Sequence, residues 1–167
     1  NINAIPSETL KELIESGQYV PSYMWNQNGW LCSKMNLHVI SQTQKCYPTA
    51  HSEDLFSTTL NTTIKAGDPT GMRAIVTTET EEGITFVTEC VGKVFAPDEF
   101  DRNDWTFIGE PETTVSVNQP ATVEMTCATI VNRIPQLIDA PAGYVTTDKY
   151  PYNEYCVHDL NTYVKTK

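Results

Sequence analysis

The chain has 167 residues and a formal net charge of -10, with 40% hydrophobic and 10% aromatic residues. This length and hydrophobic content suffice for one domain with a sizeable core and argue against a disordered chain. The acidic balance, without any Lys- or Arg-rich run, argues against a nucleic-acid partner, because phosphate recognition needs a cationic surface. No apolar run approaches the roughly 20 residues that span a bilayer, so we expect no membrane partner.

The N-terminal part of the chain carries scattered structural signals. Ser7 is expected as the N-cap of a short helix over residues 8–16, and Gly17 is expected to end that helix. Three large aromatic residues then surround an Asn-rich turn at 23–30. Residues 55–64 fit either a strand or a weak helix, so we leave both open.

The middle of the chain has the pattern of antiparallel strands. Two runs rich in β-branched residues, 72–79 and 84–95, predict a hairpin, and 105–110 with 113–118 predict a second one. The polar segment 96–104 between the hairpins reads as a surface loop. Four successive strands with short connections favour a meander.

A helical period follows the second hairpin. Pro120 is well placed as the first helical residue, and Pro135 inside the apolar pattern predicts a kink or a restart. The pattern itself recurs at helical spacing, in Val123, Cys127, Ile130, Val131, Ile134, Leu137 and Ile138. Together these elements predict an α+β fold: a mostly antiparallel sheet, a meander of about four or more strands, packed against one long kinked helix and a short N-terminal helix. We expect residues 1–167 to form a single domain.

The sequence contains no recognisable cofactor or metal motif. It has no glycine-rich phosphate loop, so we expect no nucleotide site in this chain. The spacings of His38, Cys46 and His51 do not match the tight ligand pairs of zinc sites, so we expect no metal. The five cysteines are scattered and odd in number, which favours reduced thiols and predicts a cytoplasmic protein. Cys90 and Cys127 lie in apolar runs and are expected in the core.

Three polar residues stand out as candidates for binding a small-molecule substrate. Asn132 and Arg133 lie just before Pro135, which removes a backbone donor and leaves carbonyls near Val131 that need partners. Their side chains would either satisfy those carbonyls or line a pocket, where Arg133 would form a fork for a carboxylate. Glu110, beside a proline in a turn, is either solvated or placed to face a cationic amine.

The C-terminal half of the chain also resembles a known family. Val131-Asn132-Arg133-Ile134-Pro135, Ala140-Pro141-Ala142-Gly143 and Thr146-Thr147-Asp148 follow an apolar helix, and Gly109-Glu110-Pro111 precedes the last strand. In this order and spacing they resemble the C-terminal part of 2,4-diaminopentanoate dehydrogenase-like proteins, which are relatives of dihydrodipicolinate reductase. The resemblance covers residues 67–151.

The resemblance implies that a longer parent protein binds its cofactor and its substrate with two different domains. Such proteins bind NAD(P) through an N-terminal Rossmann domain, while the C-terminal domain holds the substrate and builds a homo-oligomer. The parent would catalyse the reversible oxidative deamination of an amino acid or diamine, and this chain alone would be inactive. The alternatives are a stand-alone small-ligand-binding or assembly module without catalytic activity, and a secreted or surface structural protein.

Overall fold

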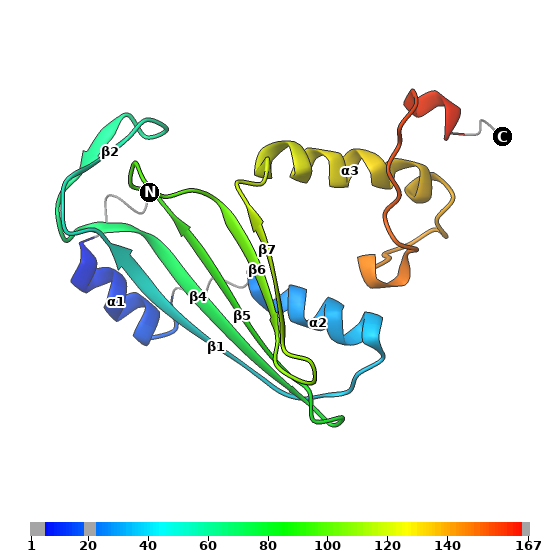
Figure 1. Cartoon of the computed structure of the whole chain (residues 1–167), viewed down its shortest axis with the longest axis horizontal. Helices are drawn as coiled ribbons and strands as arrows, with labels where there is room; N and C mark the ends of the chain where they lie inside the picture. The colour runs from blue at the N-terminus through cyan, green and yellow to red at the C-terminus, as the bar shows by residue number, and fades with distance from the viewer. Residues whose placement is uncertain (1–5, 19–22, 165–167) are drawn as a thin grey trace. The chain divides into compact units, whose positions relative to one another are not determined.

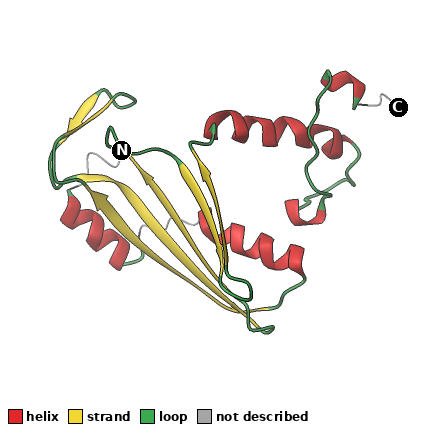
Figure 2. Ribbon diagram, in the orientation of Figure 1, coloured by secondary structure: helices red, strands yellow, loops and turns green. Residues whose placement is uncertain are grey.

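The computed structural model describes residues 6–18 and 23–164, which cluster into two compact units (Figure 1). Unit 1 is Asn1–Pro97 and unit 2 is Asp98–Lys167. Each unit is described by itself below. The secondary structure is that of an α+β protein with antiparallel sheets, which confirms the predicted fold class (Figure 2).

The described residues of unit 1 form two helices and five strands. The chain orders them as α1 Ser7–Glu15, α2 Tyr23–Met35, β1 Val39–Ala50, β2 Leu55–Ser57, β3 Thr62–Ile64, β4 Pro69–Thr80 and β5 Thr85–Lys93. The three long strands form one antiparallel sheet in the order β1-β4-β5, and β2 pairs with β3 in a small separate hairpin. The hairpin predicted over 72–95 is therefore confirmed as β4 and β5.

Helices cover one face of the three-stranded sheet. The alternation of side chains along the central strand β4 shows this burial. Met72, Ala74 and Val76 on β4 are buried, whereas Arg73 between them is exposed. Both α1 and α2 contact this sheet. Leu10 of α1 is fully buried, so the core of unit 1 lies between these helices and the three-stranded sheet.

A buried amide fixes α2 to the sheet. The Nδ2 group of Asn28 donates to Thr78 Oγ1 at 3.0 Å and to the Val76 carbonyl at 3.4 Å, and Thr88 Oγ1 donates to Asn28 Oδ1 at 2.9 Å. The amide is thus paired on both sides, as a buried polar group requires.

Several local predictions for unit 1 were wrong. Ser7 is the first residue of α1, and its N-cap is Pro6. The Asn-rich segment after residue 23 is the helix α2 and not a turn, since burial of Asn28 and Cys32 against the sheet outweighs the turn preference of Asn. We did not predict β1, which has Pro48 in its sequence. A proline is compatible with an edge strand such as β1, because its missing N–H need not join a ladder.

Unit 2 contains a hairpin, a long helix and an irregular C-terminal segment. The elements are β6 Arg102–Phe107, β7 Thr113–Asn118, α3 Thr122–Ile138 and two short 3-10 turns, Thr147–Lys149 and Leu160–Thr162. The second predicted hairpin is confirmed, although β6 begins inside the segment expected to be a loop. Helix α3 is continuous across Pro135 and starts two residues after Pro120. No described side chain of unit 2 is buried, so Cys127, expected in the core, is exposed.

None of the helices within 6–18 and 23–164 is long and apolar enough to cross a bilayer.

Candidate functional site

The β6–β7 hairpin of unit 2 has one polar and one apolar face. In its register Trp105 pairs with Val115 and Asn103 pairs with Val117, while Asp104 on the opposite face pairs with Ser116. On the polar face, hydrogen bonds from the Ser116 hydroxyl and from Arg102 hold the pKa of the Asp104 carboxyl below its usual range. The apolar face is therefore the one available to form a binding surface.

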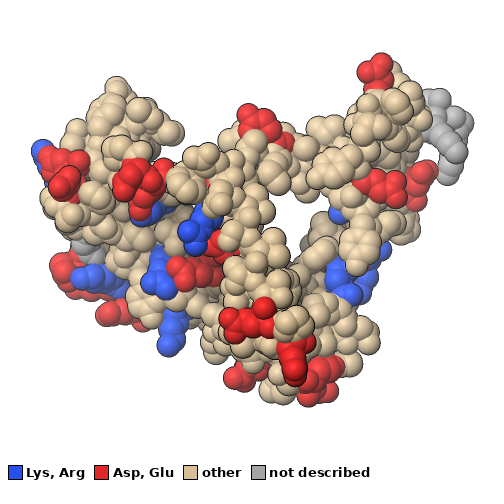
Figure 3. Space-filling model, in the orientation of Figure 1, with Lys and Arg blue, Asp and Glu red and all other residues tan. Residues whose placement is uncertain are grey.

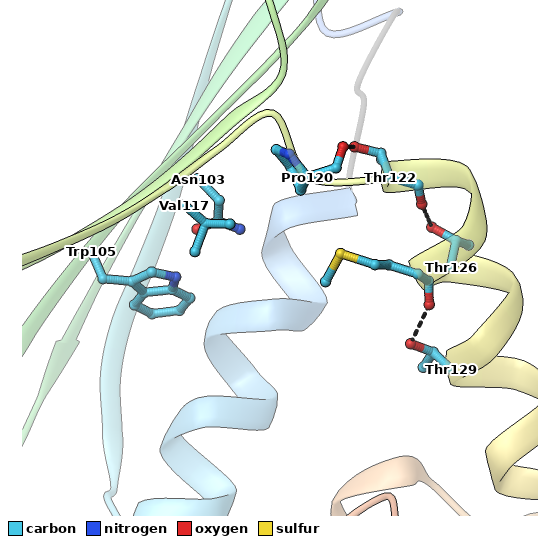
Figure 4. Close-up of a pocket in the computed structure, with 8 residues that line it drawn as sticks. Asn103, Trp105, Val117, Pro120, Thr122, Thr126 and Thr129 are labelled. Carbon is cyan, nitrogen blue, oxygen red and sulfur yellow. Dashed lines mark hydrogen bonds between the residues drawn. The ribbon is translucent and has the colours of Figure 1, made fainter. Parts of the chain in front are cut away.

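A pocket of about 320 Å³ lies between this apolar face and α3 (Figure 4). The hairpin and the helix each contribute side chains that point toward the other. The lining residues are Asn103, Trp105, Val117, Pro120, Thr122, Met125, Thr126 and Thr129.

The polar groups of the α3 wall are already engaged. Thr126 Oγ1 donates to the Thr122 carbonyl at 2.8 Å, and Thr129 Oγ1 donates to the Met125 carbonyl at 2.9 Å. Thr122 Oγ1 donates to the Asp101 carboxylate at 2.7 Å. The hydroxyls of these threonines are therefore already hydrogen-bonded within the chain. No lining residue titrates near neutral pH, so the pocket can hold an apolar group but supplies no general acid or base.

Asn132 and Arg133, predicted to bind substrate, lie side by side on α3 and hold the C-terminal segment. Arg133 Nη1 donates to the Pro151 carbonyl at 2.8 Å and also contacts Gln136 Oε1, and the guanidinium lies 5.6 Å from the Tyr150 ring centroid. Asn132 Oδ1 accepts from the Cys156 N–H at 3.0 Å. Among the described residues, these two side chains thus hydrogen-bond to the segment after the helix and not to carbonyls near Val131.

Glu110, the third predicted residue, lies in the turn between β6 and β7, next to a cis peptide bond with Pro111. Among the described residues no hydrogen bond or ion pair joins Glu110 to Asn132 or Arg133. The structure therefore brings two of the three candidates together. The pocket with Trp105 and Met125 was not predicted, although Trp105 and Phe107, which alternate with polar residues, are a signal that would have indicated its hairpin wall.

The turn from β7 into α3 does not fit the pyrophosphate of a nicotinamide dinucleotide. A pyrophosphate is usually held where a strand enters a helix through closely spaced glycines, whose backbone approaches the phosphates. In this chain β7 enters α3 through Asn118-Gln119-Pro120-Ala121, and no glycine lies in that turn. We therefore assign no cofactor contact to these residues.

The described residues also lack a metal cluster. No group of three or more His, Cys, Asp or Glu side chains is placed to hold an ion in this part of the chain. His38 instead pairs with Glu82, with 2.7 Å between Nδ1 and Oε1. His51 hydrogen-bonds through Nδ1 to the backbone N–H of Glu53, at 3.1 Å.

Comparison with solved structures gives the chain a relative. The structure of an amine dehydrogenase from Mycobacterium smegmatis superposes with a TM-score of 0.84 and 34% sequence identity over 92% of this chain. The chain is similar to part of that dehydrogenase. It spans 46% of the length of the matched protein. No protein-family model and no curated protein matches the sequence. The likeness supports a dehydrogenase-like domain of the oxidoreductase class, and the narrower relation to 2,4-diaminopentanoate dehydrogenase stays a prediction.

Proposed function

We propose that the chain is the C-terminal, substrate-binding and oligomerisation domain of an NAD(P)-dependent amine or amino-acid dehydrogenase. The observation that carries the proposal is the 34% identity to a solved amine dehydrogenase over 92% of this chain, which accounts for only 46% of that protein. A parent of that length has room for a separate cofactor-binding domain. The sequence motifs around Asn132 and Gly143 support the same assignment independently.

In this proposal Arg133 and Asn132 take part in binding the substrate. Within the described part of the chain, both hydrogen bonds of the Arg133 guanidinium come from Nη1. The donors on Nε and Nη2 are therefore left for a substrate carboxylate. Glu110 is proposed for a cationic amine, because its carboxylate lies on the exposed turn of the hairpin. The apolar pocket beside Trp105 supplies space for an uncharged portion of the substrate.

The uncovered face of the three-stranded sheet is proposed as the contact with a second copy. Its side chains alternate with the buried ones and include Tyr47, Arg73, Val87, Glu89 and Val91. Arg73 and Glu89 pair across the strands, with 2.8 Å between Nε and Oε1. A surface that carries both charge signs and half-exposed apolar residues has the composition that an isologous interface needs.

The test is an assay of the parent protein for amine- or amino-acid-dependent reduction of NAD+ and NADP+. We expect activity from the parent and neither activity nor cofactor binding from the 167-residue chain. Tight NADPH binding by this chain alone would contradict the domain assignment. A parent that binds small ligands but reduces neither cofactor would favour the stand-alone binding or assembly module.

The same assay tests Arg133. In Arg133→Ala we expect a higher KM for an amino-acid substrate and an unchanged KM for the corresponding amine, because only the former carries a carboxylate. Equal effects on both substrates, together with a lower Tm, would assign Arg133 to anchoring the C-terminal segment alone. Sedimentation of the 167-residue chain and of its Val87→Lys variant tests whether the uncovered sheet face mediates self-association.

A further inference from the structure

Arg133 has only neutral partners, unlike the other described Arg and Lys side chains of unit 2. Those two, Arg102 and Lys149, form ion pairs with Asp104 and Asp148. Figure 3 shows acidic side chains over the end of α3 and the C-terminal segment, yet among the described residues no carboxylate pairs with Arg133. A half-buried charge without a counter-charge is costly, because protein solvates it less well than water does. The position therefore favours an anion that the described chain does not supply.

Three neutral groups hold the guanidinium of Arg133 in one orientation. Its Nη1 donates to the Pro151 carbonyl at 2.8 Å and to Gln136 Oε1, and its Cζ lies 5.6 Å from the centroid of the Tyr150 ring. Since both hydrogen bonds come from Nη1, the edge formed by Nε and Nη2 makes none within the described part of the chain. That edge has two parallel N–H donors, which match the two oxygens of a carboxylate.

Gln136 links this orientation to the C-terminal segment. Its Nε2 donates to the Tyr152 carbonyl at 2.9 Å, while its Oε1 accepts from Arg133. A rotated amide would set donor against donor at Arg133 and acceptor against acceptor at Tyr152, so only one orientation of the amide satisfies both groups. Glu has no donor for the carbonyl and Lys has no acceptor for the guanidinium, so neither could make both bonds.

We propose that Gln136 is a positioning residue that presents the Nε and Nη2 edge of Arg133 to the carboxylate of the substrate. The inference rests on the proposed function, in which Arg133 binds that carboxylate. An unheld arginine side chain loses rotamer freedom when it binds a ligand, whereas the guanidinium held by Gln136 has lost that freedom beforehand. Substrates that carry a carboxylate are thereby favoured over amines that lack one.

Asn153 provides a matched control, because it also ties the C-terminal segment to α3. Its Nδ2 donates to the Thr129 carbonyl at 3.0 Å, and among the described residues it makes no hydrogen bond to Arg133. Asn153→Ala and Gln136→Met each remove one side-chain hydrogen bond between the helix and the segment. Only Gln136→Met also removes an acceptor of Arg133. A purely structural role for Gln136 therefore predicts equal effects of the two variants on Arg133.

The test is an NMR titration of the 167-residue chain with sodium propionate, which follows the Nε–H resonance of Arg133. Propylammonium chloride at the same ionic strength is the control for salt and for the alkyl group. In the wild type we expect a saturable shift with propionate and none with propylammonium. Gln136→Met should weaken propionate binding at least about tenfold, because the guanidinium is no longer held, whereas Asn153→Ala should change it less than about twofold.

A second substitution keeps the acceptor for Arg133 and adds a charge. Gln136→Glu places a carboxylate beside the guanidinium and should abolish the propionate response, because the chain then supplies the counter-charge itself. Retained binding in this variant would overturn the proposal. Absence of a saturable response in the wild type would do the same, as would equal losses in Gln136→Met and Asn153→Ala. Inorganic phosphate that binds more tightly than propionate would overturn the carboxylate as the ligand.

Steady-state kinetics of the parent protein give a readout that a structural role would not move. Gln136→Met should raise the KM for an amino-acid substrate at least about tenfold relative to the KM for the corresponding amine, with a smaller change in kcat. Asn153→Ala should leave the ratio of the two KM values as it is in the wild type. A common loss of kcat on both substrates in Gln136→Met would assign Gln136 to structure alone.

Failure of this proposal and failure of the proposed function give different results. A parent that reduces NAD+ or NADP+ with amines, while the propionate response is insensitive to Gln136→Met, would keep the dehydrogenase assignment and remove the positioning role. A parent that reduces neither cofactor, while the response is lost in Gln136→Met, would keep the carboxylate site and remove the dehydrogenase assignment.

Discussion

Unit 1 and unit 2 differ in how far they bury their apolar side chains. Unit 1 places Leu10, Met72 and Val76 in a core between two helices and a sheet. Unit 2 has comparably apolar elements, yet none of its described side chains is buried. Since both units contain enough apolar residues, composition does not explain the difference. Unit 1 carries both layers of its own core, whereas the apolar surfaces of unit 2 require a layer supplied from elsewhere.

The largest expected effect comes from truncating one leucine in each unit of the 167-residue chain. Leu10→Ala, at a side chain with 0% exposure, should lower the free energy of unfolding by about 2–5 kcal/mol. Leu137→Ala, at 61% exposure, should change it by less than about 0.5 kcal/mol. Urea denaturation of the two variants measures both values.

Equal losses in that pair would mean that unit 2 has a core of its own in solution. The parent protein sharpens the comparison further. If the apolar side of α3 is covered there, Leu137→Ala becomes a core truncation in the parent and its cost rises toward that of Leu10→Ala.

A smaller effect is expected from polar pairs that differ in burial. Asn28→Ala removes the amide that binds Thr78 and Thr88, and the buried hydroxyls it leaves behind should cost about 1–3 kcal/mol. Thr106→Val removes an exposed hydroxyl pair with Thr114, 3.0 Å apart, and should cost less than about 0.5 kcal/mol.

Denaturation measures both variants, and faster exchange of the α2 amides in Asn28→Ala would locate the loss. If Thr106→Val were the more costly change, the hairpin of unit 2 would be a more stable element than its exposure indicates.

The smallest effect concerns the pair of His38 and Glu82 in unit 1. Their hydrogen bond and the charge of Glu82 raise the pKa of His38, and hydrogen bonds from His38 lower the pKa of Glu82. The His38 contribution to stability is complete below its unfolded pKa and is lost as pH rises through the folded pKa. The Glu82 contribution is present above its unfolded pKa and is lost as pH falls through the folded pKa.

The pair therefore stabilises unit 1 most between the unfolded pKa of Glu82 and the unfolded pKa of His38, and the stabilisation is lost beyond the lowered pKa of Glu82 and the raised pKa of His38. NMR titration of the His38 ring should show a lower pKa in Glu82→Gln than in the wild type. Glu81→Gln, which removes only a charge effect, should lower it less. Equal shifts in the two variants would show that the hydrogen bond is not formed in solution.

The periodic parts of the chain were predictable from sequence because local pattern dictates them. Alternation along 72–79 and 113–118 indicated strands, and apolar spacing over 123–138 indicated a helix, since each element exposes one face to a single environment. The helix α2 and the edge strand β1 escaped prediction. Their residues have weak local preferences, and contacts such as Asn28 with Thr78 decide their structure.

The candidate site was likewise only partly predictable from the sequence. The sequence singled out Asn132 and Arg133 by their motif, and the tertiary structure showed that they hold residues 151–156 against α3. Only the folded chain brings Trp105 and Met125 to one pocket, because these residues lie on different elements. The sequence determined that α3 has an apolar side, a property of spacing alone. The tertiary structure decided that this side stays uncovered in unit 2, because burial depends on which surfaces the fold brings into contact.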